Sequence, residues 1–514
     1  MKVIHTILLS LAFLASQAKL QAGFSYVTNA DHTLTVVSYS GPPWDVAIPT
    51  NANGLTVTGI KDNAFMNSAN LVNITIPSSV TNIGSQSFYS CTALTNVIFG
   101  SNIASFGDRT FSACASLTHV FLPNSLTNIG DAAFGYCTNL TEISLGSGIS
   151  VLGDLEFENC SSLTNIIIPG NVTSIGGGAF ENCISLTNVV IPDSVTNLGS
   201  SAFYYCTNLS SITLSSNLVS IAGQTFYNCV RLGRITIPPS VTGIGLQAFG
   251  TCINLTSVTI PNSVTNIGDA AFTDCWKLAN VVIPDSVISI GNQCFYQCTT
   301  LTQLTIPNSV TSMGESAFAH CTGLTNASLG NSLATIKDFT FASCSNLTRV
   351  RIPDSVTSIG YGSFENCTSL TNAVIGDGVV SLGYVTFADC TSLSSVFFMG
   401  NAPLSNMYPF AGDTSAIAYY LPHTSGWFDY IDSIPTAPWL PRIVMNSNFG
   451  AQLNQFGFDV NWVSGQTIVV EFCADLGDPN WQPLQTNVIT SDSIHFTDPM
   501  WTNYASRFYR VTSP

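Results

Sequence analysis

The sequence predicts an elongated α/β solenoid of 23-residue units, dominated by β-structure with short helical turns, followed by a small all-β C-terminal sandwich. Two observations predict the solenoid. Cysteine recurs at intervals of exactly one unit from Cys91 to Cys390, and phenylalanine stands three residues before each of these cysteines. Within each unit the apolar spacing also changes from helical to alternating. A third observation, short strand-like runs without the repeat after residue 440, predicts the sandwich.

Residues 1–22 have the pattern of a signal peptide. Lys2 and His5 precede the apolar run 7–15, and the small residues Ala18 and Ala22 offer cleavage sites. A short buried helix is the less favoured alternative, because the run is at the extreme N-terminus and a polar, strand-like segment follows it. We therefore expect export. No later stretch approaches ~18 uninterrupted apolar residues, so the sequence predicts no membrane span.

Residues 23–64 are expected to form an N-terminal cap. A solenoid exposes an apolar end unless atypical turns cover it. Residues 24–37 have the alternation of a hairpin, residues 46–49 that of a further strand, and residues 51–54 are interpreted as a loop outside the repeat phase.

Residues 65–398 are expected to form the repeats, and residues 176–195 show how one unit is built. Phe180, Cys183 and Leu186 are spaced as one face of a short helical turn, whereas Val189 and Ile191 alternate as in a strand. One such turn cannot bury these side chains alone. Stacking about fifteen turns at ~4.8 Å per rung gives a continuous core roughly 70 Å long.

The cysteines are expected to be core residues in the reduced state. Sixteen cysteines in an exported chain would ordinarily indicate disulfides. Neighbouring turns, however, keep the Cβ atoms of the ladder parallel and about 4.8 Å apart, beyond the ~3.5–4.5 Å that a disulfide needs. Free cysteine packs well as a small buried apolar residue.

The repeat resembles a known family. Residues 255–275 read Leu-Thr-x-Val-x-Ile-Pro-x-Ser-Val-Thr-x-Ile-Gly-x-x-Ala-Phe-x-x-Cys, which is similar to the unit of the BspA-like class of leucine-rich repeats. The resemblance covers about residues 65–400. It implies the leucine-rich repeat fold and a secreted or cell-surface protein that binds other macromolecules, often host or matrix proteins, without catalysis. A few units depart from the pattern at the expected Gly (Ala222, Lys337) or Pro (Gly100, Gly146, Gly330, Gly376).

Residues 399–440 are expected to form a C-terminal cap and linker, and residues 441–514 a β-sandwich module. The strand-like runs of the module are 456–460, 467–472 and 507–511. The terminal Arg-Phe-Tyr-Arg-Val resembles the last module of many exported bacterial proteins, which leaves its ligand open.

Composition and motifs exclude several function classes. Thirteen basic against 29 acidic residues give a net charge of −16, which repels phosphate backbones and excludes nucleic acid as a partner. No familiar catalytic spacing occurs, so we predict no enzyme and no cofactor. The closest approach to a metal cluster is Cys294 and Cys298 with His320 and Cys321. These cysteines occupy ordinary core positions of the repeat, so no metal site is predicted.

The outward residues of the repeat strands are the predicted binding surface. Positions four, five and seven after each cysteine should form three exposed stripes. Exposed apolar residues in a secreted protein commonly mark an interface. The third stripe carries seven of them: Ile98, Phe121, Ile167, Val190, Val282, Val374 and Phe397. Alternatively, the stripes are a solvated sheet, and the arginines of this face either anchor an acidic partner or offset the local negative field. The predicted binding residues are Ile98, Phe121, Ile167, Val190, Arg234, Arg349 and Arg351.

The first functional hypothesis is therefore an exported, adhesin-like interaction protein whose partner is an extracellular protein or matrix component. The second is a glycan-binding accessory protein that binds polysaccharide through the C-terminal β-domain. The third is a passive surface spacer. The second rests on five tryptophans near the C-terminal end, although tryptophan in a small β-domain is more often a core residue: Trp427, Trp439, Trp462, Trp481 and Trp501.

Overall fold

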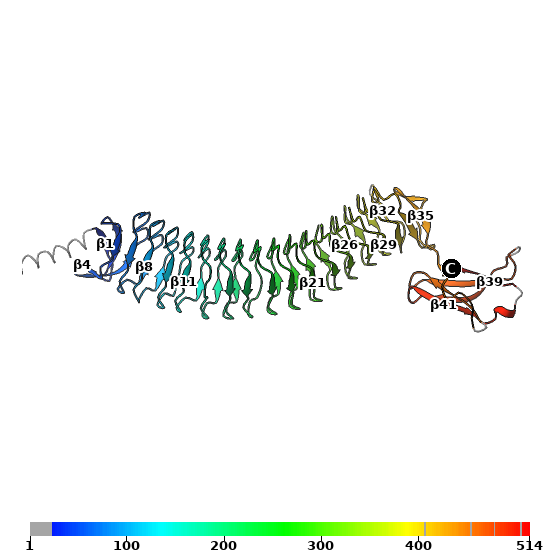
Figure 1. Ribbon diagram of the computed structural model, residues 1–514, viewed down its shortest axis with the longest axis horizontal. Helices are drawn as coiled ribbons and strands as arrows, with labels where there is room; N and C mark the ends of the chain where they lie inside the picture. The colour runs from blue at the N-terminus through cyan, green and yellow to red at the C-terminus, as the bar shows by residue number, and fades with distance from the viewer. Residues whose placement is uncertain (1–22, 406–407, 453–454, 477–478, 504–505) are drawn as a thin grey trace, which may run out of the picture.

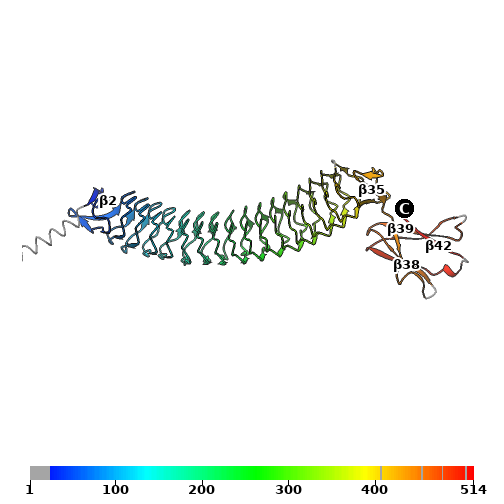
Figure 2. The same ribbon diagram turned by 45° about the horizontal axis from the view of Figure 1, so that its top comes forward.

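The protein is a long stack of coils followed by a separate pair of β-sheets (Figure 1). The computed structural model describes residues 23–405, 408–452, 455–476, 479–503 and 506–514, so the predicted signal peptide lies outside the described residues. Figure 2 shows from a second direction that the coils lie side by side along one gently curved axis. Across the described part of the chain, no helix is long and apolar enough to span a membrane.

The N-terminal cap continues both sheets of the solenoid. Its strands are β1 (Phe24–Thr28), β2 (Leu34–Tyr39), β3 (Asp45–Ala47), β4 (Asn51–Ala52) and β5 (Leu55–Ile60). β1 and β2 form the expected antiparallel hairpin, and β5 pairs in parallel with β2. Residues 51–54 are not a plain loop: β4 and β5 form a second hairpin, whose turn residues Asn53 and Gly54 both have positive φ.

Most coils contribute one strand of three or four residues to a long-strand sheet; in the coil of residues 164–168 only an isolated bridge, Asn165 with Asn188, is formed. Pairing is parallel, and partners are one 23-residue unit apart, as in Ser257 with Asn280. The strands of this sheet within the repeats are β6 (Asn73–Thr75), β8 (Asn96–Ile98), β10 (His119–Phe121), β11 (Glu142–Ser144), β14 (Asn188–Val190), β16 (Ser211–Thr213), β17 (Arg234–Thr236), β19 (Ser257–Thr259), β21 (Asn280–Val282), β23 (Gln303–Thr305), β25 (Asn326–Ser328), β27 (Arg349–Ile352), β29 (Asn372–Ile375) and β31 (Ser395–Phe398).

Most coils add a two-residue strand to a second, short-strand sheet. A glycine follows most of these strands because neighbouring coils approach closely there: a Cβ on Gly314 would lie 2.3 Å from the backbone nitrogen of Asn292. The strands are β7 (Asn82–Ile83), β9 (Ser105–Phe106), β12 (Val151–Leu152), β13 (Ser174–Ile175), β15 (Asn197–Leu198), β18 (Gly243–Ile244), β20 (Asn266–Ile267), β22 (Ser289–Ile290), β24 (Ser312–Met313), β26 (Thr335–Ile336), β28 (Ser358–Ile359), β30 (Ser381–Leu382) and β32 (Leu404–Ser405).

The predicted inward residues form one continuous core. Phe180, Cys183, Leu186, Val189 and Ile191 are all buried. The phenylalanine rings of successive coils stack face to face from Phe65 to Phe410 at centroid separations between 4.9 and 6.1 Å. Stability therefore comes from contacts between neighbouring coils, as in other repeat proteins.

The prediction of short helical turns is wrong. The single helix in the described residues is the 3-10 turn η1 (Trp501–Asn503), outside the repeats. In the unit containing Phe180, Gly178 and Asn182 have φ of 59° and 57°, which interrupts a right-handed helix. The Phe180 amide donates to the Ala202 carbonyl of the next coil, at 2.8 Å, instead of to its own helix. The i, i+3 spacing of apolar residues arises from consecutive reverse turns.

The ladder thiols are each hydrogen-bonded. In each repeat the cysteine Sγ contacts the carbonyl oxygen of the phenylalanine in the preceding coil, as Cys183 Sγ does with Phe157 at 3.2 Å. The same contact extends from Cys91 with Phe65 to Cys390 with Phe364. Burial raises the pKa of these thiols, to about 12 for Cys252. A protonated, buried thiol is a poor nucleophile.

We expect the cysteines to be free and unreactive in the folded protein. Native protein should react with almost none of its sixteen thiols, and denatured, unreduced protein with nearly all of them. Ellman titration with and without denaturant measures both values. Fewer than about four free thiols after denaturation would show that the ladder distorts to form disulfides.

The last coils extend the long-strand sheet beyond the repeat pattern. Strands β33 (Ile417–Tyr420) and β35 (Ile434–Pro438) are its final parallel members, and β34 (Tyr430–Ile431) forms a hairpin with β35. Residues 434–438 are rich in proline and lie within the predicted cap and linker, 399–440. They form a strand near the edge of the sheet, where missing amide donors are tolerated.

Residues 442–512 form two antiparallel sheets. One contains β36 (Arg442–Val444), β37 (Gly450–Gln452), β38 (Gln455–Asn461) and β41 (Ser493–Asp498); the other contains β39 (Thr467–Cys473), β40 (Gln482–Val488) and β42 (Phe508–Thr512). Both sheets contribute to one apolar cluster, which also includes Leu421 of the terminal coil.

Candidate functional site

The long-strand sheet presents an outward face along the solenoid. Most of its three-residue strands have a buried central residue between two exposed ones. The predicted third stripe is therefore on the surface: the exposed fractions are 53% for Ile98, 66% for Phe121, 77% for Ile167 and 64% for Val190. None of these four side chains is needed in the core.

The hydrogen-bonded pairing of this sheet is interrupted, a feature that the repeat pattern did not predict. Among the described strands, this pairing is absent at four places. They lie between β8 and β10, between β11 and residues 164–168, between β16 and β17, and between β21 and β23. Ile98 and Phe121 lie on either side of the first interruption, and Ile167 follows the second. Arg234 begins the strand after the third. Val190 lies in a paired strand.

Surface hollows lie at three of these interruptions. The hollow at the second interruption is lined by Ser144, Asn165 and Ile167, together with Glu142. Thr213 and Arg234 line the hollow at the third, and Val282 lines the one at the fourth. Ile167 and Val282 thus lie beside depressions with polar side chains in their walls, which a flat solvated sheet would not provide.

The three predicted arginines do not form one cluster. Arg349 and Arg351 project from the same strand, β27, whereas Arg234 lies five coils earlier. The Arg351 guanidinium is 4.0 Å from the Asp354 carboxylate, and both side chains are more than half exposed. No carboxylate in the described residues lies within ion-pair distance of Arg349.

The third stripe continues beyond Arg351, and Tyr419 is a member that the sequence did not assign to it. Strand register places Val374, Phe397 and Tyr419 in line with it. The Phe397 ring stacks on Tyr419 at 5.2 Å and contacts Trp439 at 4.4 Å. A strict 23-residue phase would align Tyr419 with the buried Val396, but the strands pair at a separation of 22 residues here, which aligns Tyr419 with Phe397 instead.

The cysteine and histidine cluster considered for a metal does not converge. Cys298 and Cys321 contact the carbonyls of the preceding coils, and Cys294 is buried. His320 packs edge-on against Tyr296. Over the described ranges, no three His, Cys, Asp or Glu side chains are arranged to hold a metal ion.

Two acidic side chains are buried in the solenoid core. Glu156 occupies the position of Ala133 and Ala179 in the adjacent coils, and burial raises its pKa well above the usual value. Asp413 occupies the cysteine position of the terminal coil, and burial raises its pKa to about 8. In the described structure, neither carboxyl has a side-chain hydrogen bond. Because both are enclosed, neither can act on a bound molecule.

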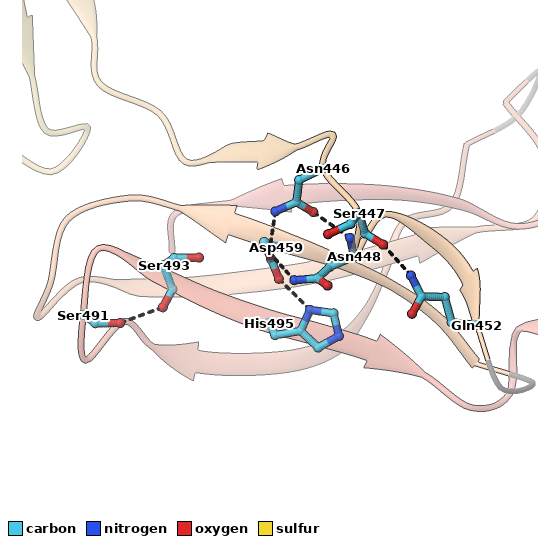
Figure 3. A network of polar contacts seen from close by, with 8 residues as sticks. All are labelled: Asn446, Ser447, Asn448, Gln452, Asp459, Ser491, Ser493 and His495. Carbon is cyan, nitrogen blue, oxygen red and sulfur yellow. Dashed lines mark hydrogen bonds and ion pairs between the residues drawn. The ribbon is translucent and has the colours of Figure 1, made fainter.

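The C-terminal sheets contain a polar network centred on Asp459 (Figure 3). Its carboxylate accepts hydrogen bonds from Asn446 Nδ2 at 2.7 Å and Asn448 Nδ2 at 2.8 Å, and lies 2.6 Å from His495 Nδ1. These hydrogen bonds lower the pKa of Asp459. The network ties the connection between β36 and β37 to β38 and β41, which is a structural role.

The terminal Arg-Phe-Tyr-Arg-Val segment is also structural. Arg507 forms a buried ion pair with Asp498 at 2.8 Å, and Tyr509 Oη donates to the same carboxylate. Arg510 faces the other way and pairs with Glu471. Arg507, immediately before β42, is therefore inside, whereas Arg510 within β42 is near the surface.

The tryptophans of the glycan hypothesis do not form a common platform. Trp462 is buried, and its Nε1 donates to the Trp439 carbonyl. Trp427 stacks on Tyr420, and Trp481 lies beneath Arg510. Most of these rings serve packing within the terminal coil and the C-terminal sheets.

The repeats match a known family, and the chain is similar to solved leucine-rich repeat structures. Residues 58–187, 150–279 and 265–394 match the family described as "BspA type Leucine rich repeat region (6 copies)". A leucine-rich repeat protein from Bacteroides ovatus has a TM-score of 0.56 and 27% identity, with 77% of this chain and 93% of that one covered. A leucine-rich cell surface protein from Faecalibacterium prausnitzii has a TM-score of 0.39 and 25% identity, with 74% and 94% covered. No curated protein matches the sequence.

Proposed function

Because the chain belongs to the BspA-type leucine-rich repeat family, we propose that it is an exported, non-enzymatic interaction protein of the cell surface or its surroundings. Its partner is an extracellular protein or matrix component, and it binds through the outward face of the long-strand sheet. Residues 441–514 form a separate sandwich module that attaches the chain or adds a second contact. Export rests on the signal-peptide pattern of residues 1–22.

One observation carries this proposal: large apolar side chains are exposed beside the interruptions of the sheet. Ile167 and Val282 are 77% and 76% exposed although nothing in the coil requires an apolar residue there. An anchor row of this kind suits a protein edge or an extended chain, because a small metabolite needs a concave, enclosing pocket. The polar hollows next to the row provide hydrogen-bonding groups for the rim of such an interface.

Changing Phe121 and Ile167 to Thr should weaken binding by about tenfold or more. Each side chain, as an interface hot spot, would contribute about 1 kcal/mol or more to binding. The measurement is affinity of the full secreted chain for a partner isolated by affinity capture. Circular dichroism should show an unchanged fold, because threonine is common at outward positions of neighbouring units.

The matched control changes Val151 and Val219 to Thr. Val151 belongs to the short-strand sheet, Val219 lies outside the long-strand sheet, and both are about half exposed. This variant should bind normally. Equal losses in both variants would show that the long-strand face has no special role, and unchanged affinity in both would place the interface elsewhere.

A further inference from the structure

We propose that the C-terminal part of the long-strand face, from β25 to β35, docks an acidic polypeptide segment whose carboxylates are followed by apolar side chains. This rests on the proposed function, and it adds the location and the chemistry of the partner. The basic end of the surface is a hollow between β25 and β27, and its apolar end is the row Val374, Phe397 and Tyr419.

The hollow at the basic end arises because two strands separate. Asn326 and Ala327 pair with Arg349 and Val350, but the pairing does not continue to Ser328 and Arg351. Amide and hydroxyl side chains surround the opening together with both guanidinium groups. The polar lining is Asn326, Ser328, Asn331, Arg349, Arg351 and Asn372.

The charge of this hollow is complementary to carboxylates. Thirteen basic residues occur in a chain of net charge −16, and two of them lie side by side on β27. Arg349 has no carboxylate within ion-pair distance in the described part of the chain, and Arg351 has only the exposed Asp354 at 4.0 Å. Guanidinium groups bind carboxylates through two parallel hydrogen bonds.

The neighbouring row favours a polypeptide over an anionic polysaccharide. Val374, Phe397 and Tyr419 are partly exposed and follow Arg351 across adjacent strands in register. Trp439 packs against Phe397 at the end of this row. Arginine with aromatic residues is the composition of protein interface hot spots, whereas a sulfated glycan has no apolar side chains to fill the row.

Selection from a phage-displayed library of random 12-residue peptides on the full chain tests the proposal. We expect enrichment of sequences in which Asp or Glu precedes aliphatic or aromatic residues. Selected peptides should bind at least tenfold more weakly to Arg349→Gln/Arg351→Gln, and their affinity should fall as salt is raised. Arg109→Gln/Arg231→Gln removes the same charge from exposed positions outside this face and should bind normally.

Other outcomes would overturn the proposal. If the selected peptides lack acidic residues, or if they bind equally well to both double variants, Arg349 and Arg351 do not take part in binding. A third outcome is that no acidic peptide is selected, while dextran sulfate binds the wild-type chain but not Arg349→Gln/Arg351→Gln. The ligand would then be an anionic polysaccharide. If the peptide selection and the arginine variants give these negative results while Phe121→Thr/Ile167→Thr still weakens partner binding, the proposed function stands. Only the acidic segment as the occupant of this surface is then rejected.

Discussion

Deleting residues 253–275 should leave a folded solenoid one coil shorter, whereas deleting residues 253–264 should abolish cooperative folding of the repeats. The first deletion removes exactly one period, so the coils that meet already carry Phe, Cys and Leu in matching positions. The second moves these residues by half a unit, which turns aliphatic side chains toward water and breaks the phenylalanine stack. Each displaced Phe or Leu would cost several kcal/mol, as large-to-small core changes do.

Circular dichroism melting and size-exclusion chromatography of both deletions measure the difference. The whole-unit deletion should melt cooperatively within a few degrees of the full chain, because each coil contacts only its neighbours. The half-unit deletion should lose cooperativity or aggregate. Equal melting of the two proteins would contradict a solenoid that depends on exact register.

Replacing Glu156 by Ala should stabilise the protein, and more so at high pH. The pKa of Glu156 is raised in the folded state above its unfolded value, so its contribution to stability is greatest below the unfolded pKa and falls as pH rises through the folded one. Alanine fits, since Ala133 and Ala179 stand at the equivalent positions. We expect the free energy of unfolding to rise by about 3 kcal/mol near pH 8, because the variant removes both the cost of burying a carboxyl without a partner and the cost of keeping it protonated. Near pH 4 only the first cost is removed, so the increase should be smaller.

Urea unfolding at both pH values measures this gain. Glu315→Ala changes an exposed carboxylate in another coil and should have little effect at either pH. Asp413, whose pKa is raised to about 8, should show the same sign of pH dependence: its contribution falls between about pH 4 and 8. Equal gains from Glu156→Ala at both pH values would contradict a carboxyl held protonated by burial.

The sequence predicted which side chains of the coil face inward and which face outward, because that signal is repeated many times. The inward positions of Phe180, Cys183 and Leu186 follow from spacing alone, and each coil repeats the same evidence. The outward stripe follows from strand alternation, which placed Ile98, Phe121, Ile167 and Val190 on the surface. Whether they bind a partner remains a prediction.

Features that depend on backbone hydrogen bonds were not predicted. The i, i+3 spacing of Phe and Cys fits both a helix and a series of reverse turns, and only the bonds to the next coil distinguish them. The interruptions of the long-strand sheet have no apparent sequence marker, because the units on both sides keep the same pattern. The hairpin at Asn53 and Gly54 does have a marker, because an Asn-Gly pair is typical of a two-residue hairpin turn and not only of a loop.

The hydrogen bonds between coils also determine how the rod would carry a load. Neighbouring coils are joined by short parallel strands and by the carbonyls that the phenylalanine amides contact, so an axial pull acts on these groups in series. The weakest junction yields first, and it releases a coil whose 23 residues extend to about 80 Å. A protein anchored at one end would then lengthen in discrete steps and would absorb tension before the bond to its partner breaks.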